Sequence, residues 1–291
     1  MDKPIKVRFI IGGFVIALIS EKGRGIFDFD ERYRKFYTSD EAQVLLNVLY
    51  GEMPDFYSWN LIFDSGGLWK LYKWEDHWVV GVYSSPMELE ISYAAIFEHD
   101  FYSGDIFLPN GNKTINSFPY TYPLPEVHMI NLLSQGNGVL VHACAVKYGE
   151  SGLLFAGTSR AGKSTTAELW KTQGNATILS DDRVIIRKHE GQFWVYGTPW
   201  HGTAGSGSPE AVPLTRIYFL KQAPENQLLA LKPVDAHTKM LVRSFPTYWN
   251  SAGMDFTLGF LDELVQEVPC FVLDFVPDNS VVDFVKCQNY V

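Results

Sequence analysis

The segment Gly157–Ser164 constrains this sequence most, because it fits the pattern G-x-x-x-x-G-K-[ST] of a Walker A phosphate loop, or P-loop. The apolar run Leu153–Ala156 precedes it and the apolar-periodic segment Ala167–Trp170 follows it, so a strand–loop–helix unit is predicted. Glycines let backbone N–H groups turn inward, and a helix start offers unsatisfied N–H groups to an anion. The segment therefore predicts a nucleotide-phosphate site. The alternative is a glycine-rich turn that caps a helix and leaves Lys163 in solvent.

The loop pattern assigns a role to each of its polar residues. Lys163 is expected to reach the β- and γ-phosphates as a point charge, and the Ser164 hydroxyl to bind Mg²⁺. ATP is the expected nucleotide, with GTP left open because no base-reading motif is visible. The residues predicted to contact the nucleotide are Gly157, Thr158, Ser159, Arg160, Ala161, Gly162, Lys163, Ser164 and Thr165.

Two further places carry candidate chemistry. Asp181 and Asp182 end the apolar strand predicted at 176–179, where ligands of open α/β sheets collect. Two adjacent carboxylates suit one metal ligand and one base, although Asp-Asp is also common in exposed turns. His142 lies within an apolar strand before the loop. It is either a catalytic histidine or a hydrogen-bonded core residue.

Composition excludes some classes of function. The 291 residues carry a net charge of −9, which argues against a nucleic-acid partner because such a partner requires a basic surface. The odd number of cysteines, three, does not indicate a disulfide framework. The apolar run Phe9–Ile19 is too short to span a bilayer and is expected to be a buried strand. We therefore expect a cytoplasmic protein with no membrane partner.

The pattern of apolar runs predicts two domains. Residues 1–120 are expected to form a β-rich domain that binds substrate or partner. It is expected to contain a strand pair or one bent strand in 6–20, a helix at Ala42–Tyr50 and a hairpin of Leu68–Trp74 with His77–Tyr83. Residues 121–291 are expected to form the nucleotide-binding catalytic domain, which begins with a helix at 124–135. Strands and helices alternate there, which indicates an α/β (α+β) fold with a mixed sheet.

Three segments together resemble the catalytic domain of the HPr kinase/phosphorylase family. They are His142–Val146, the loop Gly157–Thr165, and Leu179–Val184. The resemblance is closer to HPr-kinase-related serine kinases of bacterial gene clusters and covers about residues 123–285. It implies a phosphoenolpyruvate carboxykinase-like fold.

The resemblance also implies roles for single residues. Lys163 and Ser164 would bind phosphate and Mg²⁺, and Asp182 would be a metal ligand. Asp181 would be the base and His142 would lie near the γ-phosphate. The family has Glu near the metal where this chain has Thr165, which leaves the metal geometry and reverse phosphorolysis open. The family's segment for gripping a protein substrate has no clear equivalent, so HPr is not the expected acceptor. The stretch 202–208 is either a mobile lid or a plain flexible loop.

The expected function is that of an ATP- and Mg²⁺-dependent kinase, a phosphotransferase. Its acceptor would be a Ser- or Thr-type hydroxyl of a peptide, protein or small metabolite. One alternative is a nucleotide-binding regulatory or scaffold module without turnover. Another is a carboxykinase-type enzyme for a small acid, which is disfavoured because no Arg-rich acid pocket is visible. Homo-oligomeric assembly and reverse phosphorolysis stay open.

Overall fold

A computed structural model describes residues 5–20, 30–55, 58–88, 90–109, 118–173, 175–200, 202, 205 and 207–288. The chain divides into two compact units. The first contains residues 1–10 and 14–135, and the second contains residues 11–13 and 136–291. The division after Gln135 falls beyond the expected boundary at 120/121, so the helix that follows this boundary belongs to the first unit.

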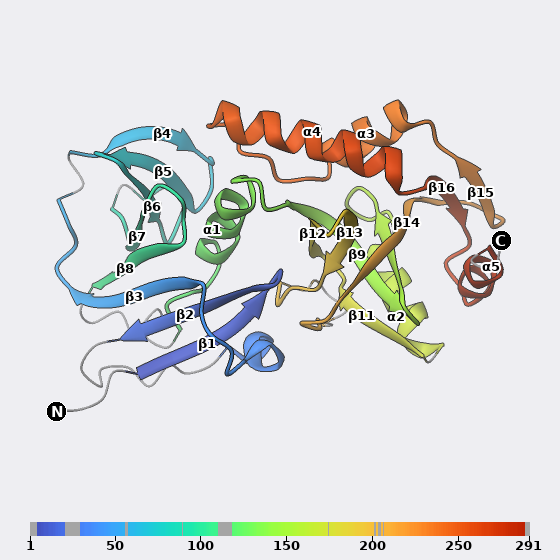
Figure 1. The fold of residues 1–291 in the computed structure, drawn as a ribbon, viewed down its shortest axis with the longest axis horizontal. Helices are drawn as coiled ribbons and strands as arrows, with labels where there is room; N and C mark the ends of the chain where they lie inside the picture. The colour runs from blue at the N-terminus through green and yellow to red at the C-terminus, as the bar shows by residue number, and fades with distance from the viewer. Residues whose placement is uncertain are drawn as a thin grey trace. The chain divides into compact units, whose positions relative to one another are not determined.

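The first unit is built on an eight-stranded mixed sheet with the order β1-β2-β3-β8-β7-β6-β5-β4 (Figure 1). The pairs β2–β3 and β3–β8 are parallel, and the pairs from β8 through β7, β6 and β5 to β4 are antiparallel. The strands are β1 Ile5–Ile11, β2 Phe14–Ser20, β3 Val44–Gly51, β4 Asn60–Asp64, β5 Trp69–Trp74, β6 His77–Val82, β7 Tyr93–Phe97 and β8 Ser103–Pro109. The expected strand pair in 6–20 and the β5–β6 hairpin are confirmed.

The prediction of a helix at Ala42–Tyr50 is wrong, because β3 occupies this segment. Its side chains alternate between buried and exposed, with Val44, Leu46 and Val48 inside and Leu45 and Asn47 outside. This period of two is that of a strand with one covered face. Parallel pairing with β2 and β8, which lie far from β3 in the sequence, satisfies its backbone groups. Tertiary pairing thus overrides a local pattern that also fits a helix.

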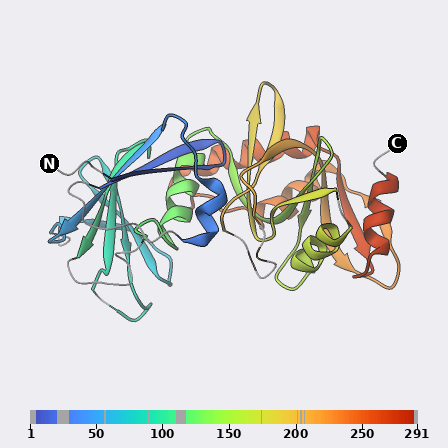
Figure 2. The ribbon, with the colours of Figure 1, turned by 90° about the horizontal axis from the view of Figure 1, so that it is seen from below.

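Two helical segments complete the first unit: the 3₁₀ helix Glu31–Phe36 and α1, Leu124–Leu133. Both views show α1 beside the sheet (Figure 1, Figure 2). An aromatic cluster fills part of the core, in which the Tyr33 ring lies 5.3 Å from that of Phe9 and 4.8 Å from that of Phe118. Edge and tilted contacts of this kind stabilise a core beyond the burial of apolar area alone.

The second unit also contains an eight-stranded mixed sheet, with the order β10-β9-β12-β13-β14-β16-β15 and with β11 added beside β9. Its longest strands, β9 and β14, each pair with different neighbours along their two halves. β10 also pairs with β14 in parallel. The strands are β9 Val139–Tyr148, β10 Ser151–Ala156, β11 Ala176–Ser180, β12 Arg183–His189, β13 Gln192–Tyr196, β14 Ala211–Gln222, β15 Gln227–Ala230 and β16 Cys270–Phe275.

Helices cover both faces of this sheet (Figure 1). α3 (Pro233–Leu241) and α4 (Ser251–Glu267) bury Met240 and Leu261 in one hydrophobic cluster. α2 (Lys163–Thr172) and α5 (Ser280–Gln288) bury Trp170 and Val282 in a second cluster. The loop that the sequence singled out therefore lies between β10, which is buried from Gly152 to Ala156, and a helix anchored by its own apolar face.

The strand–loop–helix unit predicted around Gly157–Ser164 is present as β10 and α2, and β12 and β13 form a hairpin further along the chain. The hairpin turns at Glu190 (φ 50°) and Gly191 (φ 76°), and two positive φ angles suit the twist of a two-residue hairpin. The strand β15 was not foreseen. Among the described residues, no helix combines the length and the apolar character needed to cross a bilayer.

Candidate functional site

The strand register brings the sequence-predicted segments to one edge of the second unit's sheet. β10 and β11 both pair antiparallel with β9. Ala156, the last residue of β10, pairs with Ala143, and Ser180, the last residue of β11, pairs with Ala145. The loop after β10 and the Asp pair after β11 therefore emerge at the same end of β9 as His142.

A pocket of about 310 Å³ lies at this edge. Nine sequence-predicted site residues line it, together with Gly202, the first residue of the expected lid or flexible loop, and Gln222, which the sequence did not indicate. Of the predicted loop residues, Gly157, Thr158 and Ala161 lie outside the lining. The predicted residues in the lining are His142, Ser159, Arg160, Gly162, Lys163, Ser164, Thr165, Asp181 and Asp182.

The loop backbone requires glycine at both ends. Gly162 caps α2 with φ 108°, and a Cβ there would lie 2.6 Å from the Phe275 ring. A Cβ on Gly157 would lie 2.7 Å from the Ala161 methyl. No side chain caps the start of α2. The first N–H groups of this helix are therefore available to an anion.

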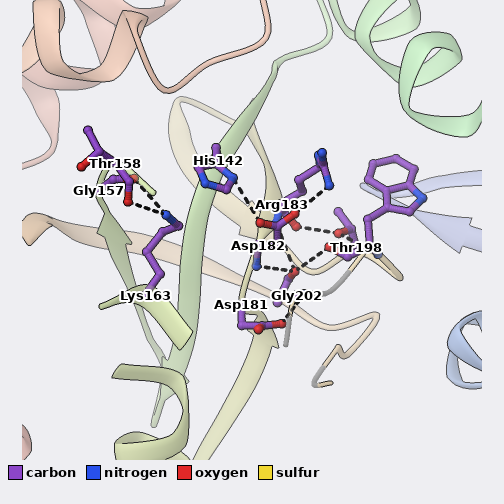
Figure 3. A network of polar contacts seen from close by, with 11 residues as sticks. His142, Gly157, Thr158, Lys163, Asp181, Asp182, Arg183, Thr198 and Gly202 are labelled. Atoms are coloured by element: carbon purple, nitrogen blue, oxygen red, sulfur yellow. Dashed lines mark hydrogen bonds and ion pairs between the residues drawn. The ribbon is translucent and has the colours of Figure 1, made fainter. Parts of the chain in front are cut away.

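Lys163 is the first residue of α2 and is buried, with 7% of its surface exposed. Its Nζ donates to the carbonyls of Gly157 and Thr158, each at 3.0 Å (Figure 3). Burial lowers the pKa of Lys163, the Asp182 carboxylate opposes this shift, and the Arg243 charge adds to it. The ammonium group is thus held inside the loop. It does not extend into solvent, as it would in a glycine-rich turn that only caps the helix.

Asp182 lies between two nitrogen groups (Figure 3). Its Oδ1 is 3.2 Å from His142 Nδ1, and its Oδ2 accepts from Arg183 Nη1 at 2.6 Å. Burial lowers the pKa of His142, the Lys163 charge lowers it further, and the Asp182 carboxylate raises it. The lowered pKa favours the neutral imidazole near pH 7, with Nδ1 within hydrogen-bonding distance of the carboxylate.

Asp181 points to the opposite side of the same turn and is 1% exposed. Its Oδ1 accepts the Gly202 N–H at 2.8 Å (Figure 3). Nearby, a Cβ on Gly197 would lie 1.9 Å from the Ser208 carbonyl, so this close approach requires glycine. The backbone contact holds Asp181 in a fixed position at the pocket wall. Of the stretch 202–208, expected to be a lid or a flexible loop, residues 203, 204 and 206 lie outside the described residues.

The oxygen donors of this pocket fit a hard divalent cation. The Ser164 hydroxyl and the Asp182 carboxylate line the same pocket, and oxygen ligands are those that Mg²⁺ takes. In the described parts of the chain, no group of three or more His, Cys, Asp or Glu side chains could hold a metal ion. The donor set thus suits an ion that receives most of its ligands from phosphate and water.

Fold and site together define a mixed α/β protein in which a strand, a glycine loop and a helix face two carboxylates across a pocket. The model of the family described as SynChlorMet cassette protein ScmC matches residues 126–276. This match spans more than half of the chain, so the chain belongs to this family.

Other comparisons are weaker. A search of curated proteins found no match. Among solved structures, the chain is weakly similar to the Hpr(Ser) kinase/phosphatase from Coxiella burnetii, with a TM-score of 0.32 and 10% sequence identity. That alignment covers 52% of this chain and 95% of the other.

Proposed function

We propose that the second unit binds ATP with Mg²⁺ in the pocket at the β9–β10–β11 edge and transfers the γ-phosphoryl group to a hydroxyl acceptor. The observation that carries the proposal is the convergence of Lys163, Ser164 and the Asp181–Asp182 pair on one pocket, from segments separated in the sequence. These are the groups that phosphoryl transfer requires: a phosphate cradle, a metal ligand and a base.

Positioning and charge neutralisation would supply most of the catalysis. In our proposal, the uncapped start of α2 and the Gly157–Gly162 loop would donate N–H groups to the phosphates. Lys163 would exchange its two carbonyl partners for phosphate oxygens, since both kinds of partner accept from an ammonium group. Ser164 and Asp182 would hold Mg²⁺, which neutralises phosphate charge when bound.

The two carboxylates would have different roles. Asp182 contacts His142 and Arg183, which orient it as a metal ligand. Asp181 is fixed by the Gly202 N–H. It would accept the proton of the incoming hydroxyl, a contribution of about 10²–10⁴-fold for a well-placed general base. The motif resemblance supports a Ser- or Thr-type hydroxyl as the acceptor, and the first unit would bind the substrate or a partner.

The test is incubation with γ-labelled ATP and Mg²⁺, with and without candidate peptides, combined with a nucleotide-binding titration. The variant is Lys163→Ala, and the matched control is Lys171→Ala, which changes an exposed lysine on the same helix. We expect the first to lose binding and transfer and the second to retain both. Nucleotide binding without transfer would instead support the regulatory module. Equal nucleotide binding by wild type and Lys163→Ala would refute the loop assignment.

A further inference from the structure

A second pocket adjoins the first on the other side of the loop. Its volume is about 590 Å³, which suits a small organic ligand or a peptide side chain. Arg160 and Gln222 line both pockets, so the two pockets share a wall. The backbone N–H of His142 donates to the backbone carbonyl of Arg243 at 2.7 Å, and Arg243 also lines the second pocket. The second pocket thus lies directly beside the proposed catalytic groups.

The charge of this second pocket, which we call the basic pocket, is opposite to that of the protein. Four cationic side chains line it, namely Arg160, Lys221, Lys239 and Arg243. No Asp or Glu of the described residues is part of its lining. The whole chain carries a net charge of −9. Such a concentration of cations in one cavity of an acidic protein attracts an anion.

Two of these cations, Lys239 and Arg243, have hydrogen-bond donors to spare for a ligand. Lys221 is not one of them, because it lies 3.2 Å from Asp274, which neutralises its charge. Arg243 donates through Nη1 to the Lys239 carbonyl at 2.7 Å, and its buried Nε has no hydrogen-bond partner among the described residues. The Phe219 ring lies 5.4 Å from this guanidinium and restricts its position. Lys239, near the end of α3, lines the same pocket.

We propose that Lys239 and Arg243 bind an anionic group, a carboxylate or a phosphate, of the molecule that accepts the phosphoryl group. The apolar side chains Phe219, Leu229 and Val272 on the same lining would contact the body of that acceptor. The acceptor role rests on the proposed function, whereas the anion site rests on the pocket alone. The acceptor is therefore an acidic molecule with a hydroxyl, such as a peptide with an acid near its Ser or Thr.

The experiment measures equilibrium binding of labelled inorganic phosphate, and separately of labelled succinate, to the full chain at low ionic strength. Saturating non-hydrolysable ATP analogue and Mg²⁺ are present in one series and absent in the other. Lys239→Gln is the test variant and Lys232→Gln, at an exposed position just before the same helix, is its control. We expect Lys239→Gln to weaken binding roughly tenfold or more, the usual loss for a hydrogen bond to a charged group. Lys232→Gln should bind as wild type does.

The outcomes separate the sources of the anion. Preference for phosphate assigns a phosphate-bearing acceptor, and preference for succinate assigns a carboxylate. Equal binding by wild type and Lys239→Gln overturns the proposal, as does complete displacement of the probe by the nucleotide analogue. Lys163→Ala should retain the Lys239-dependent site. Failure of the proposed function would appear separately, as the absence of nucleotide binding, and would not abolish this anion site.

Discussion

Two histidines, one in each unit, show how differently the two units use buried polar side chains. His128 of α1 is fully buried in the first unit. Its Nε2 lies 2.8 Å from the Phe101 carbonyl, which can only accept, so Nε2 carries the proton. Its Nδ1 then accepts from the Tyr120 hydroxyl at 2.6 Å. Both ring nitrogens are therefore satisfied inside the core, and the Phe97 ring stacks on the imidazole at 4.7 Å.

His142 of the second unit is half-buried and lines a pocket with Lys163 and the Asp pair. Burial lowers the pKa of both histidines, that of His128 to about 4. A lowered pKa therefore does not distinguish a structural histidine from a functional one. The distinguishing feature is where the partners lie: His128 has core partners, whereas His142 contacts an acid that can also face a ligand. Substitutions in the core of the first unit should thus change the free energy of unfolding. Substitutions at the pocket edge of the second unit should change the proposed phosphoryl transfer.

The largest effect is expected from Asp181→Asn. The amide oxygen can still accept the Gly202 N–H, so the fold should persist while the base is lost. Phosphoryl transfer should fall about 10²–10⁴-fold. Transfer rates measured with γ-labelled ATP, together with a thermal unfolding curve, test this. Asp262→Asn, an exposed change on α4, is the matched control and should leave both unchanged. Full turnover by Asp181→Asn would show that Asp181 is not the base.

In the first unit, the corresponding test concerns stability. Leu46 is completely buried and its neighbour Leu45 is 42% exposed. Leu46→Ala should destabilise the unit by about 2–5 kcal/mol, because it leaves a cavity in the core. Leu45→Ala should cost less than about 0.5 kcal/mol. Hydrogen exchange of peptides from 44–51 measures the loss, and nucleotide binding should be unchanged. Similar losses for both variants would contradict the strand assignment of β3.

The parts of the fold that the sequence predicted are those fixed by local chemistry. A Cβ would lie 2.7 Å from the Ala161 methyl at Gly157 and 2.6 Å from the Phe275 ring at Gly162, so both positions require glycine. The spacing of the two glycines therefore predicts the loop and the start of α2. Asp181 and Asp182 could be predicted because an apolar strand ends just before them. In each case the sequence signal lies within about ten residues, although the ring that excludes a side chain at Gly162 is that of the distant Phe275.

The parts that the sequence did not predict depend on distant segments. The sequence of β3 also fits a helix, because its pairing with β8 joins residues more than fifty positions apart and leaves no local signal. Gln222 reaches the pocket because β14 pairs in parallel with β10. The basic pocket combines Arg160 with Arg243, so no local acid-binding motif could indicate it. Long-range pairing of this kind leaves no periodic signal in a single sequence.

His128 provides a pH test of the first unit. Its pKa is about 4 when folded and about 6.5 in an unfolded chain, so the unfolded state binds the proton more readily. Stability is therefore complete above pH 6.5 and is lost as the pH falls toward 4. The free energy of unfolding should fall by about 1.5 kcal/mol between pH 6.5 and pH 5 from this group. Urea unfolding over this pH range measures it.

The control for this pH dependence is His189→Gln, which changes an exposed histidine and should preserve the slope. His128→Gln should be less stable at pH 7, because it loses the stacked ring, but its stability should vary less with pH. A slope that is unchanged in His128→Gln would show that the buried imidazole is not the group responsible.

The smallest effect is expected at His142, because it acts through Asp182. His142→Ala removes the group 3.2 Å from Asp182 Oδ1. Removing a residue that orients a metal ligand typically lowers metal affinity 10–100-fold. The Mg²⁺ concentration for half-maximal nucleotide binding should therefore rise about tenfold, while stability changes little. A titration of Mg²⁺ at fixed nucleotide concentration measures this, and His128→Gln should leave it unchanged.

A second substitution shows whether the hydrogen bond itself is responsible. An asparagine amide nitrogen occupies nearly the same position as histidine Nδ1, so His142→Asn can still donate to Asp182. It should require less Mg²⁺ than His142→Ala does. Equal requirements for the two variants would mean that His142 does not orient the carboxylate. His142 would then differ from His128 only in its exposure, because neither histidine would orient an acidic side chain.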